Sequence, residues 1–499
     1  MQKIIEIRNG IVRNPEWSLN KPVNFSLADG EHIAILGPNG GGKSLLVDII
    51  TGKHPLCQSE VKYDFSPSTS KLASENIRHI TLYDSYGEGD STYYLQKRWN
   101  QHEIEDDLPT ASQLLDKECN LAGLNKQDSD KIRHQLTELF NISELLTKPI
   151  LMLSSGELRK FQLTRALLSK PRVLIIESPF IGLDAPSRQQ LCELLELLVK
   201  QMRIQIILVL SKTDEIPPFI THVVEVEDRC VGQKTEYDTL SYLYEWHKTP
   251  LPEATRQWLL SLPSSKDTID NKKEMVCFNN VTIRYGNHTI LDNLSWQVKK
   301  GERWALKGRN GSGKSTLLSL ICADNPQGYA CDIRLFGYQR GQGESIWDIK
   351  KNIGYVSPEM HRSYRMNIPA LKVVASGLRD SIGLYFKPSE EEIDRCLAWM
   401  KVFGIEGLRE KPFQQLSSGE QRLALIARAF VKDPDLLILD EPLHGLDIPN
   451  RAKVKEIIDF FFSRPEKTLI MVTHYDDELP NCITNVKTLN QTSRDASLK

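Results

Sequence analysis

The stretch Gly308-Arg309-Asn310-Gly311-Ser312-Gly313-Lys314-Ser315 has the pattern G-x-x-x-x-G-K-S. We expect an apolar strand before it, over residues 303–307, and a helix after it, over residues 315–322. Glycines in such a loop let successive backbone N–H groups point at phosphate, and the helix N-terminus behind it favours an anion. Lys314 would then neutralise the β- and γ-phosphates, and the Ser315 hydroxyl would reach Mg²⁺. The stretch therefore predicts a nucleotide-phosphate site in an α/β fold.

Three landmarks of the sequence occur twice in the same order, which indicates two homologous domains. The paired segments are 37–44 with 308–315, 153–157 with 416–420, and 181–184 with 444–447. The first pair is 271 residues apart and the other two pairs are 263 residues apart. We therefore predict a first domain over residues 1–236, a linker over 237–274 and a second domain over 275–499.

Short apolar runs alternate with expected helices in each half, which indicates a buried, largely parallel sheet. In the first half these runs are 173–176 and 205–209, and in the second half 436–439 and 469–472. The stretch between the halves contains several prolines and ends in the polar residues 264–273. That composition is typical of a flexible, solvated linker without a function of its own.

Two acids, Asp440 and Glu441, end an apolar strand of the second half and precede a proline. Asp440 at the strand tip can join the shell of a Mg²⁺ ion, and Glu441 can polarise an attacking water as general base. The first half has Glu177 and Ser178 at the corresponding positions. Glu177 is one methylene longer than Asp440, and the Ser178 hydroxyl cannot accept a proton at neutral pH. The two halves therefore differ in the chemistry that they can perform.

Both halves contain the pattern S-x-x-E, beginning at Ser154 in the first half and at Ser417 in the second. One interpretation is a capping box at the start of a helix. Another is an anion site, because a helix N-terminus presents free N–H groups to a negative ligand. The two interpretations are compatible with each other.

These segments resemble the signature motif of ATP-binding-cassette (ABC) ATPases, usually L-S-G-G-Q, and both copies keep its serine and second glycine. The resemblance covers most of both halves. It implies tandem P-loop ABC nucleotide-binding domains, each with a parallel-rich sheet core, an antiparallel β subdomain and a helical subdomain. It also implies that the domains pair head to tail, so that each ATP, with Mg²⁺, lies between one phosphate loop and the opposite signature.

Further site residues follow from this resemblance. His474 matches the switch histidine that contacts the γ-phosphate, and Tyr285 matches the aromatic residue that stacks on adenine; a structural histidine and an exposed strand tyrosine are the alternatives. The residues expected to bind ATP are Gly37, Asn39, Gly40, Gly42, Lys43, Ser44, Gly308, Asn310, Gly311, Gly313, Lys314, Ser315, Thr316, Tyr285, Ser154, Gly156, Ser417 and Gly419. The expected metal-shell residues are Ser44, Glu177, Ser315 and Asp440, and the expected catalytic residues are Glu441 and His474.

The first half departs from the family pattern at more than one position. Alignment of residues 209–217 with 472–480 places Ser211 opposite His474, and Trp17 is the candidate substitute for the stacking aromatic. A lost general base costs ~10²–10⁴ in rate. We therefore expect the site built on Lys43 to bind and hold ATP, and the site built on Lys314 to turn it over.

The family also carries a glutamine after the strand that follows the phosphate-loop helix, where it couples to a membrane partner. The second half has Ser357-Pro358-Glu359 at this place, and the first half has Tyr83-Asp84 with Gln96 further on. The absence of this glutamine from both halves disfavours the usual coupling of the ATPase to a membrane partner. The stretch from 326 to 351 nevertheless resembles the molybdate-transport ATP-binding (ModF-type) tandem cassette proteins, a subgroup also linked by name to photorepair.

Composition narrows the class of protein. The chain has 499 residues, 40% hydrophobic and 26% charged, which is ordinary for a globular protein of more than one domain. The net charge of −2 does not point to nucleic acid. We find no apolar run of ~18 residues and no signal-peptide core. The nine cysteines form no C-x-x-C pair, so we expect reduced thiols in a cytoplasmic protein, at most peripheral at the inner face of the membrane.

Three classes of partner agree with these observations. The leading interpretation is the ATP-binding component of a transport system, in which the helical middles, 73–146 and 360–408, bind a separate transmembrane permease. A ribosome-associated translation factor would require a long helical linker, a basic surface and two acting glutamates. A regulatory or repair-associated switch that binds protein or nucleic acid stays open. No residue pattern indicates a transported species.

Overall fold

The structure of the chain is a computed structural model. It describes residues 2–57, 59–81, 109–121, 126–150, 153, 155–180, 183, 185–211, 216–238, 250–263, 274–285 and 288–489. The described residues up to 238 form one compact unit and those from 250 form another, and each unit is described by itself below. All nine cysteines are free thiols, four of which are buried.

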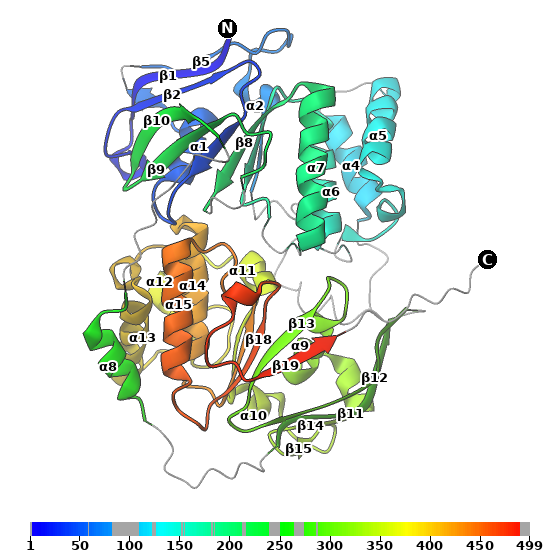
Figure 1. Cartoon of the computed structure of the whole chain (residues 1–499), viewed down its shortest axis with the longest axis vertical. Helices are drawn as coiled ribbons and strands as arrows, with labels where there is room; N and C mark the ends of the chain where they lie inside the picture. The colour runs from blue at the N-terminus through cyan, green and yellow to red at the C-terminus, as the bar shows by residue number, and fades with distance from the viewer. Residues whose placement is uncertain are drawn as a thin grey trace, which may run out of the picture. The chain divides into compact units, whose positions relative to one another are not determined.

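The first unit contains two sheets and a set of helices (Figure 1). Its main elements are β1 (Lys3–Val12), β2 (Val23–Ala28), β3 (Ile33–Leu36), α1 (Lys43–Ile50), β4 (Leu56–Cys57), β5 (Lys62–Tyr63), α2 (Ala73–Asn76), β6 (Ile77–Ile80), α4 (Ala111–Leu121), α5 (Lys126–Phe140), α6 (Ser155–Leu167), β7 (Val173–Glu177), α7 (Ala185–Met202), β8 (Gln205–Leu210), β9 (His222–Glu227) and β10 (Cys230–Glu236).

Strand pairing in the first unit separates an antiparallel sheet from a mostly parallel one. The antiparallel sheet has the order β2-β1-β4, with β5 also paired to β1. The larger sheet has the order β10-β9-β3-β8-β7-β6, in which only β9 and β10 run antiparallel. Apolar side chains of α1 fill the space between the two sheets. Helices α4 to α7 gather on one side of the strands (Figure 1).

The second unit repeats this arrangement. Its main elements are α8 (Glu253–Leu260), β11 (Glu274–Tyr285), β12 (His288–Lys299), β13 (Arg303–Gly308), α9 (Lys314–Ile321), β14 (Asp332–Leu335), β15 (Tyr338–Gln339), α10 (Ile346–Lys350), β16 (Ile353–Val356), α11 (Pro358–Ser363), α12 (Ala370–Ser376), α13 (Glu390–Phe403), α14 (Ser418–Phe430), β17 (Leu436–Asp440), α15 (Ile448–Phe461), β18 (Thr468–Val472) and β19 (Asn485–Leu489).

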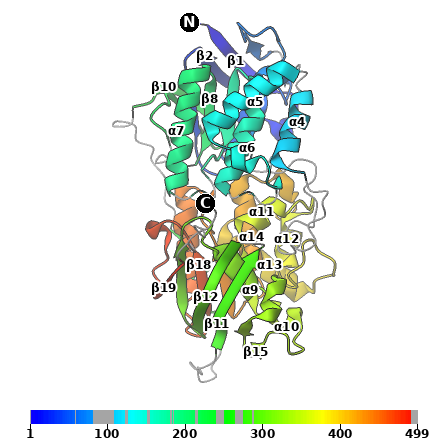
Figure 2. The same ribbon diagram turned by 90° about the vertical axis from the view of Figure 1, so that its right-hand side faces the viewer.

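The core sheet of the second unit is parallel throughout, with the order β16-β17-β18-β13-β19. The antiparallel sheet β12-β11-β14-β15 packs over α9, and β11 and β12 run side by side in Figure 2. The predicted fold class, two units that each have a parallel-rich sheet, an antiparallel sheet and a helical part, is confirmed. The strand and helix predicted around the phosphate loop are β13 and α9, each displaced by at most one residue.

Part of the predicted linker is instead an ordered piece of the second unit. Helix α8 lies within residues 237–274, and its Leu259, together with Leu251 just before it, is buried in that unit's core. The Trp258 ring meets the Trp399 ring edge to face, with centroids 5.2 Å apart. Burial of large apolar side chains stabilises such a packing by ~1.5–3 kcal/mol each, so this segment folds with the second unit. The polar residues 264–273 lie outside the described part of the chain.

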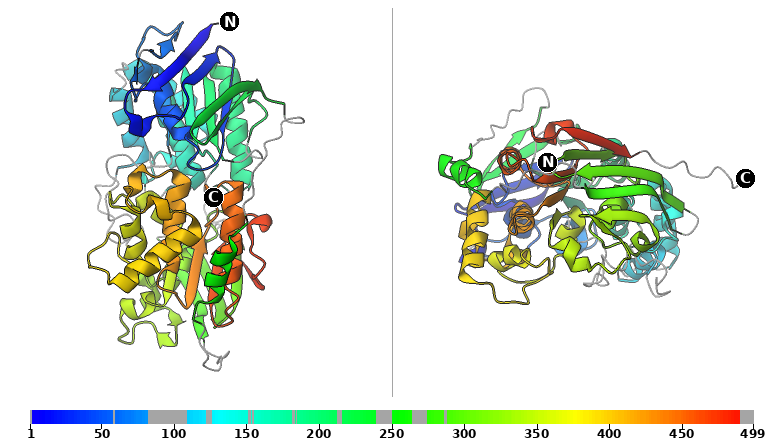
Figure 3. Two further views of the ribbon diagram at one scale, coloured as in Figure 1. Left: turned by 90° about the vertical axis from the view of Figure 1, so that its left-hand side faces the viewer. Right: turned by 90° about the horizontal axis from the view of Figure 1, so that it is seen from below.

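Aromatic side chains hold the helices of the second unit together. Trp399 of α13 is 1% exposed and lies against Phe403, Phe430 and Phe461, with ring centroids 5.1 to 6.1 Å apart. Helices α12 and α13 both pack on α14, and the three lie side by side among the yellow and orange segments of Figure 3. This packing fixes α14, the helix that begins at the signature motif.

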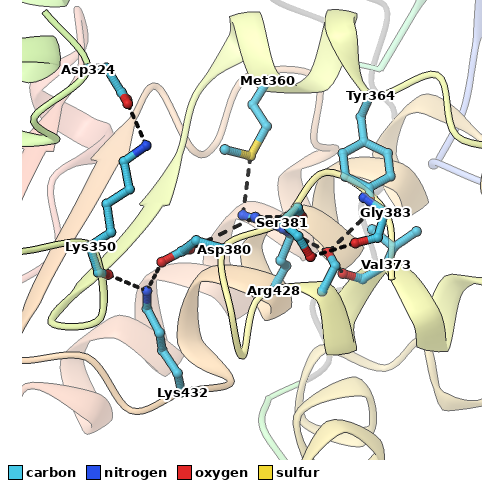
Figure 4. A network of polar contacts seen from close by, with 11 residues as sticks. Asp324, Lys350, Met360, Tyr364, Val373, Asp380, Ser381, Gly383, Arg428 and Lys432 are labelled. Atoms are coloured by element: carbon cyan, nitrogen blue, oxygen red, sulfur yellow. Dashed lines mark hydrogen bonds and ion pairs between the residues drawn. The ribbon is translucent and has the colours of Figure 1, made fainter. Parts of the chain in front are cut away.

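A network of charged side chains connects α14 to the end of the phosphate-loop helix (Figure 4). Lys432, just after α14, pairs with Asp380 and donates to the Lys350 carbonyl at 2.7 Å. Lys350 in turn pairs with Asp324, which follows α9, at 2.5 Å. Arg428 lies 3.9 Å from the same Asp380 carboxylate. Lys432 and Arg428 are buried, and Asp380 compensates their charges, whereas the Lys350–Asp324 pair that extends the network to α9 is partly exposed.

A buried histidine makes the first unit sensitive to acid. His32 is 6% exposed, its Nδ1 accepts a hydrogen bond from the Ile206 N–H at 3.2 Å, and burial lowers its pKa to about 4. The unfolded chain therefore binds a proton between pH 6.5 and 4 that the folded chain excludes. Lowering the pH from 7 to 5 should cost the first unit up to ~2 kcal/mol of unfolding free energy.

Urea unfolding at both pH values would measure this loss. His32→Gln is the matched variant, because its amide oxygen can accept from Ile206 but does not titrate in this range. The wild type should lose more stability on acidification than the variant. Equal losses in the two proteins would show that other groups cause the acid sensitivity.

Candidate nucleotide-binding and hydrolysis sites

The predicted phosphate loop of the second unit connects β13 to α9. Gly308, Gly311 and Gly313 have φ values of 158°, 80° and 89°, so the backbone turns in a way that favours glycine. A Cβ on Gly313 would lie 2.8 Å from a Leu291 methyl group, so a side chain here would require Leu291 to shift as well as a strained φ. Lys314 is 8% exposed, and its Nζ donates to the carbonyls of residues 308 and 309 at 2.7 and 2.9 Å. The lysine charge is therefore held over the loop.

This loop fits a nucleotide phosphate. The Ser312 hydroxyl is buried and has no hydrogen-bond partner within the part of the chain that the structure describes. A buried polar atom without a partner is costly, and a phosphate oxygen would satisfy it. Ser315 and Thr316 lie on the first turn of α9, behind the left-handed Gly313. The eight residues of α9 direct their N-terminal N–H groups toward the same place.

The first unit builds the same loop between β3 and α1. Gly37, Gly40 and Gly42 have φ values of 156°, 77° and 104°. Lys43 is 8% exposed, and its Nζ donates to the Gly37 and Pro38 carbonyls at 2.7 and 2.8 Å. The two phosphate loops are therefore equivalent in their backbone and lysine geometry, and Ser44 follows Lys43 on α1 as predicted.

The two acids of the second unit are both buried at the end of β17, 6% and 7% exposed. Burial raises the pKa of Asp440 well above its usual value, and the negative charges of Glu359 and Glu441 add to this effect. The positive charge of Lys314 opposes it. Asp440 is thus a carboxylate that a nearby cation would stabilise.

This arrangement fits a Mg²⁺ ion. Mg²⁺ prefers oxygen ligands and keeps several waters and phosphate oxygens in its shell, so it needs few protein ligands. Asp440 and Ser315 supply a carboxylate and a hydroxyl of this kind. No group of three or more His, Cys, Asp or Glu side chains that could hold a metal occurs among the described residues. One carboxylate, one hydroxyl and the phosphates of a nucleotide would form the shell.

Glu441 lies between two imidazoles. Its Oε1 is 3.0 Å from His474 Nε2, and its Oε2 is 2.8 Å from His444 Nδ1. Burial alone would raise the pKa of Glu441, but the contacts with His444 and then His474 lower it well below its usual value. The carboxylate is therefore ionised, the form that can accept a proton. The structure brings the two predicted catalytic residues, Glu441 and His474, into contact.

A fully buried arginine fixes the backbone of this strand end. Arg422 of α14 is 1% exposed and donates to the carbonyls of Ser357, Asp440, Glu441 and Pro442 at 2.6 to 3.2 Å. Glu441 has a φ of 47°, an uncommon conformation for a residue with a side chain, and its N–H donates to Val472 O. The guanidinium thus holds a strained residue in place and links it to the helix of the signature motif.

Strand registers confirm how the two units correspond. Ile35 pairs with Val209 in the first unit as Leu306 pairs with Val472 in the second, which places Ser211 opposite His474. Ser178 has a φ of 48° and donates its N–H to the Val209 carbonyl, so it has the backbone conformation of Glu441. The hydroxyl of Ser211 donates to Asn39 Oδ1 at 3.1 Å. Ser211, which corresponds to His474, thus contacts the phosphate loop of the first unit, but its side chain is a hydroxyl and not an imidazole.

The acid of the first unit has a different neighbour from Asp440. Glu177 Oε1 is 3.1 Å from the Nε2 of His79 on β6. The registers of β6 and β16 place Tyr355 at the corresponding position of the second unit. His79 was not a predicted site residue, because nothing in its local sequence distinguishes it from a core histidine. Its contact with Glu177 occupies a carboxylate that was expected to join a metal shell.

The signature motif forms the predicted capping box in the second unit. Ser417 Oγ accepts from the Glu420 N–H at 3.3 Å, and Glu420 Oε2 accepts from the Ser417 N–H at 2.7 Å. Gly419 is buried in the first turn of α14. In the first unit Gly156 lies in the first turn of α6, whereas Ser154 is outside the described residues.

The predicted adenine-stacking residues have other contacts in the structure. The Tyr285 hydroxyl accepts a hydrogen bond from Asn325 Nδ2 at 2.9 Å, and the ring, at the end of β11, is partly buried against the apolar core of the unit. Trp17, the candidate substitute in the first unit, stacks on His54 with ring centroids 5.2 Å apart. The residue Gln96 and the segment at Tyr83 lie outside the described residues.

Comparison with known proteins identifies the family. A model of the ABC transporter family matches residues 20–181 and 291–444. The chain is 37% identical to the ABC transporter ATP-binding protein ModF of Escherichia coli, with 96% of each chain covered. It is 29% identical to an uncharacterized ABC transporter ATP-binding protein of Schizosaccharomyces pombe, with 97% of each covered. The chain therefore belongs to the ABC transporter family.

Within that family the chain is a tandem ABC ATPase that binds and hydrolyses ATP. Among solved structures, a model of ribosome-bound archaeal Pelota and ABCE1 has a TM-score of 0.54 and 18% identity, and it covers 92% of this chain and 72% of that one. This likeness shows a shared fold. None of the helices in the described ranges has the length and apolar character needed to span a membrane.

Proposed function

We propose that the chain hydrolyses ATP mainly at the site of its second unit and holds ATP at the site of its first unit. The contrast between Glu441 and Ser178 carries this proposal. Both residues have the same backbone conformation, and each follows the corresponding strand of its unit, β7 or β17. Only Glu441 has a side chain that can accept a proton. A tandem chain with a general base in only one unit should hydrolyse ATP rapidly at only one site.

In the second unit each side chain has a distinct role. Lys314 and the loop N–H groups bind the phosphates, and Asp440 with Ser315 would hold Mg²⁺. When bound, Mg²⁺ neutralises charge on the phosphates that react. Glu441 accepts the proton of the attacking water, and His474 donates to the γ-phosphate. Arg422 keeps the strand end rigid, so that Glu441 keeps its position while the nucleotide exchanges.

The first unit has the means to bind ATP but not to cleave it rapidly. Lys43 and its loop repeat the geometry of Lys314, which supports binding. Glu177 contacts His79, and Ser211 stands in place of the histidine, which supports slow hydrolysis or none. The pairing of each phosphate loop with the opposite signature motif, through Ser154 and Gly156 or Ser417 and Gly419, stays a prediction.

Substitution of the two loop lysines tests this asymmetry, because the lysines are matched in geometry. Lys314→Met should abolish turnover, since the site with the base no longer binds the γ-phosphate. Lys43→Met should keep measurable turnover but lose one retained nucleotide per chain. ATPase rates and the ATP and ADP that remain on the chain after desalting would measure both effects. Equal loss of activity in the two variants, with the same nucleotide content, would contradict the proposal.

We further propose that this ATPase is the ATP-binding component of a transport system and works at the inner face of a membrane. The relative with 37% identity is described as an ABC transporter ATP-binding protein, and the match covers both units. A tagged Glu441→Gln chain, held with ATP, should recover one integral membrane protein from detergent extracts, and that protein should change the ATPase rate of the wild type. Recovery of ribosomes, nucleic acid or only a soluble partner from detergent-free extracts would support the alternative, a switch that is not part of a transporter.

A further inference from the structure

The turn after β17 carries a histidine, His444, at the start of the repeated segment 444–447. Residues 441–444 form a turn in which the His444 N–H donates to the Glu441 carbonyl at 3.2 Å. This turn directs the His444 ring back toward the side chain of the residue that starts it. His444 Nδ1 is 2.8 Å from Glu441 Oε2, and both side chains are at least nine-tenths buried. The ring also lies beside Tyr475, with centroids 6.1 Å apart.

The two imidazoles have different surroundings. His474 follows β18 at the position of the switch histidine and contacts Oε1, the oxygen opposite to the one that His444 contacts. A residue that donates to a bound nucleotide must release or share its contact with Glu441. The His444 ring comes from the same turn as Glu441, so its contact with Oε2 is made within that turn. His444 could therefore still orient the carboxylate if His474 turned toward a phosphate.

The tandem repeat provides an internal comparison. The offset of 263 residues places Ile181 opposite His444. The unit that carries the glutamate therefore has the histidine, whereas the unit that carries Ser178 has an apolar residue that could not contact a carboxylate. The histidine thus occurs in the unit that has the glutamate and is absent from the corresponding position of the other unit.

We infer that His444 is a positioning residue for the general base: it holds Glu441 Oε2, so that Oε1 faces the attacking water during hydrolysis at the second site. This inference rests on the proposed role of Glu441. Without His444, the Glu441 carboxylate could rotate about its last torsion angle. Misplacement of a reacting group by about 1 Å can cost ~10²-fold in rate, so the expected effect is on kcat.

His444→Asn and His444→Leu form a matched pair, because Asn and Leu have similar size but only the amide of Asn can donate near the position of Nδ1. His444→Leu should lower kcat by ~10- to 100-fold and change KM for ATP by less than about twofold. His444→Asn should stay within about threefold of the wild-type kcat. Thermal unfolding of both variants reports whether the turn remains folded.

Three results would overturn the inference: a normal kcat in His444→Leu, a loss that appears in KM alone, or an equally low kcat in the Asn and Leu variants. Glu441→Gln in the same assay separates this inference from the proposed function. If Glu441→Gln hydrolyses ATP normally, the proposed base is wrong. If Glu441→Gln is inactive and His444→Leu is normal, only the role of His444 is wrong.

Discussion

Glu441→Gln should lower ATP turnover by at least ~10²-fold while the chain still binds and retains ATP. Glutamine keeps the size of the side chain and can remain between His444 and His474, but its amide cannot accept a proton from water. The strand end should stay intact, because Arg422 contacts main-chain carbonyls that the substitution does not change. Steady-state ATPase rates, together with the ATP retained per chain, would measure this outcome.

Ser178→Glu is the reciprocal control, because Ser178 shares the backbone conformation of Glu441. We expect it to add little turnover, since the sequence has Ile181 and Ser211 where the second half has the two histidines, and Glu177 contacts His79. Normal hydrolysis by Glu441→Gln would refute the asymmetric assignment. Glu177 would then become the candidate for an unconventional base in the first unit.

Arg422→Met should destabilise the second unit by ~3–5 kcal/mol and abolish turnover, because it leaves buried acids without their compensating charge. It also removes the donors of four buried carbonyls, and burial of an unsatisfied carbonyl is itself costly. The large effect on activity follows from the strained φ of Glu441, which the guanidinium stabilises. Urea unfolding and ATPase rates would measure the two effects separately.

The tandem repeat supplies the matched control for this variant. Arg159, 263 residues before Arg422, donates to the Ser178 carbonyl at 3.3 Å and to Gln162 at 2.9 Å. The first unit has no acid at position 178, so Arg159→Met should cost less stability and leave most of the turnover. Equal destabilisation by the two variants would mean that the charge of Arg422 matters less than its packing.

The sequence predicted the fold because the fold depends on local and repeated patterns. Residues 308–315 fix a loop between a strand and a helix, and the recurrence of three landmarks fixes two units with the same order of elements. The acid pair and the phosphate-loop lysines are contiguous motifs, so their positions at strand ends and helix starts could be predicted. The linker prediction was wrong for α8, because the helix is stabilised by a distant contact with Trp399.

Two phosphate loops, and a single acid at the position proposed for the general base, could be predicted from the sequence. Only the tertiary structure showed the contacts around that base: His444 on one carboxylate oxygen, His474 on the other, and Arg422 on the backbone. It also showed His79 against Glu177 across 98 residues of chain. The physical reason is that a motif records short-range geometry, whereas the partner of a buried charge is chosen by the packing of strands and helices that are far apart in sequence.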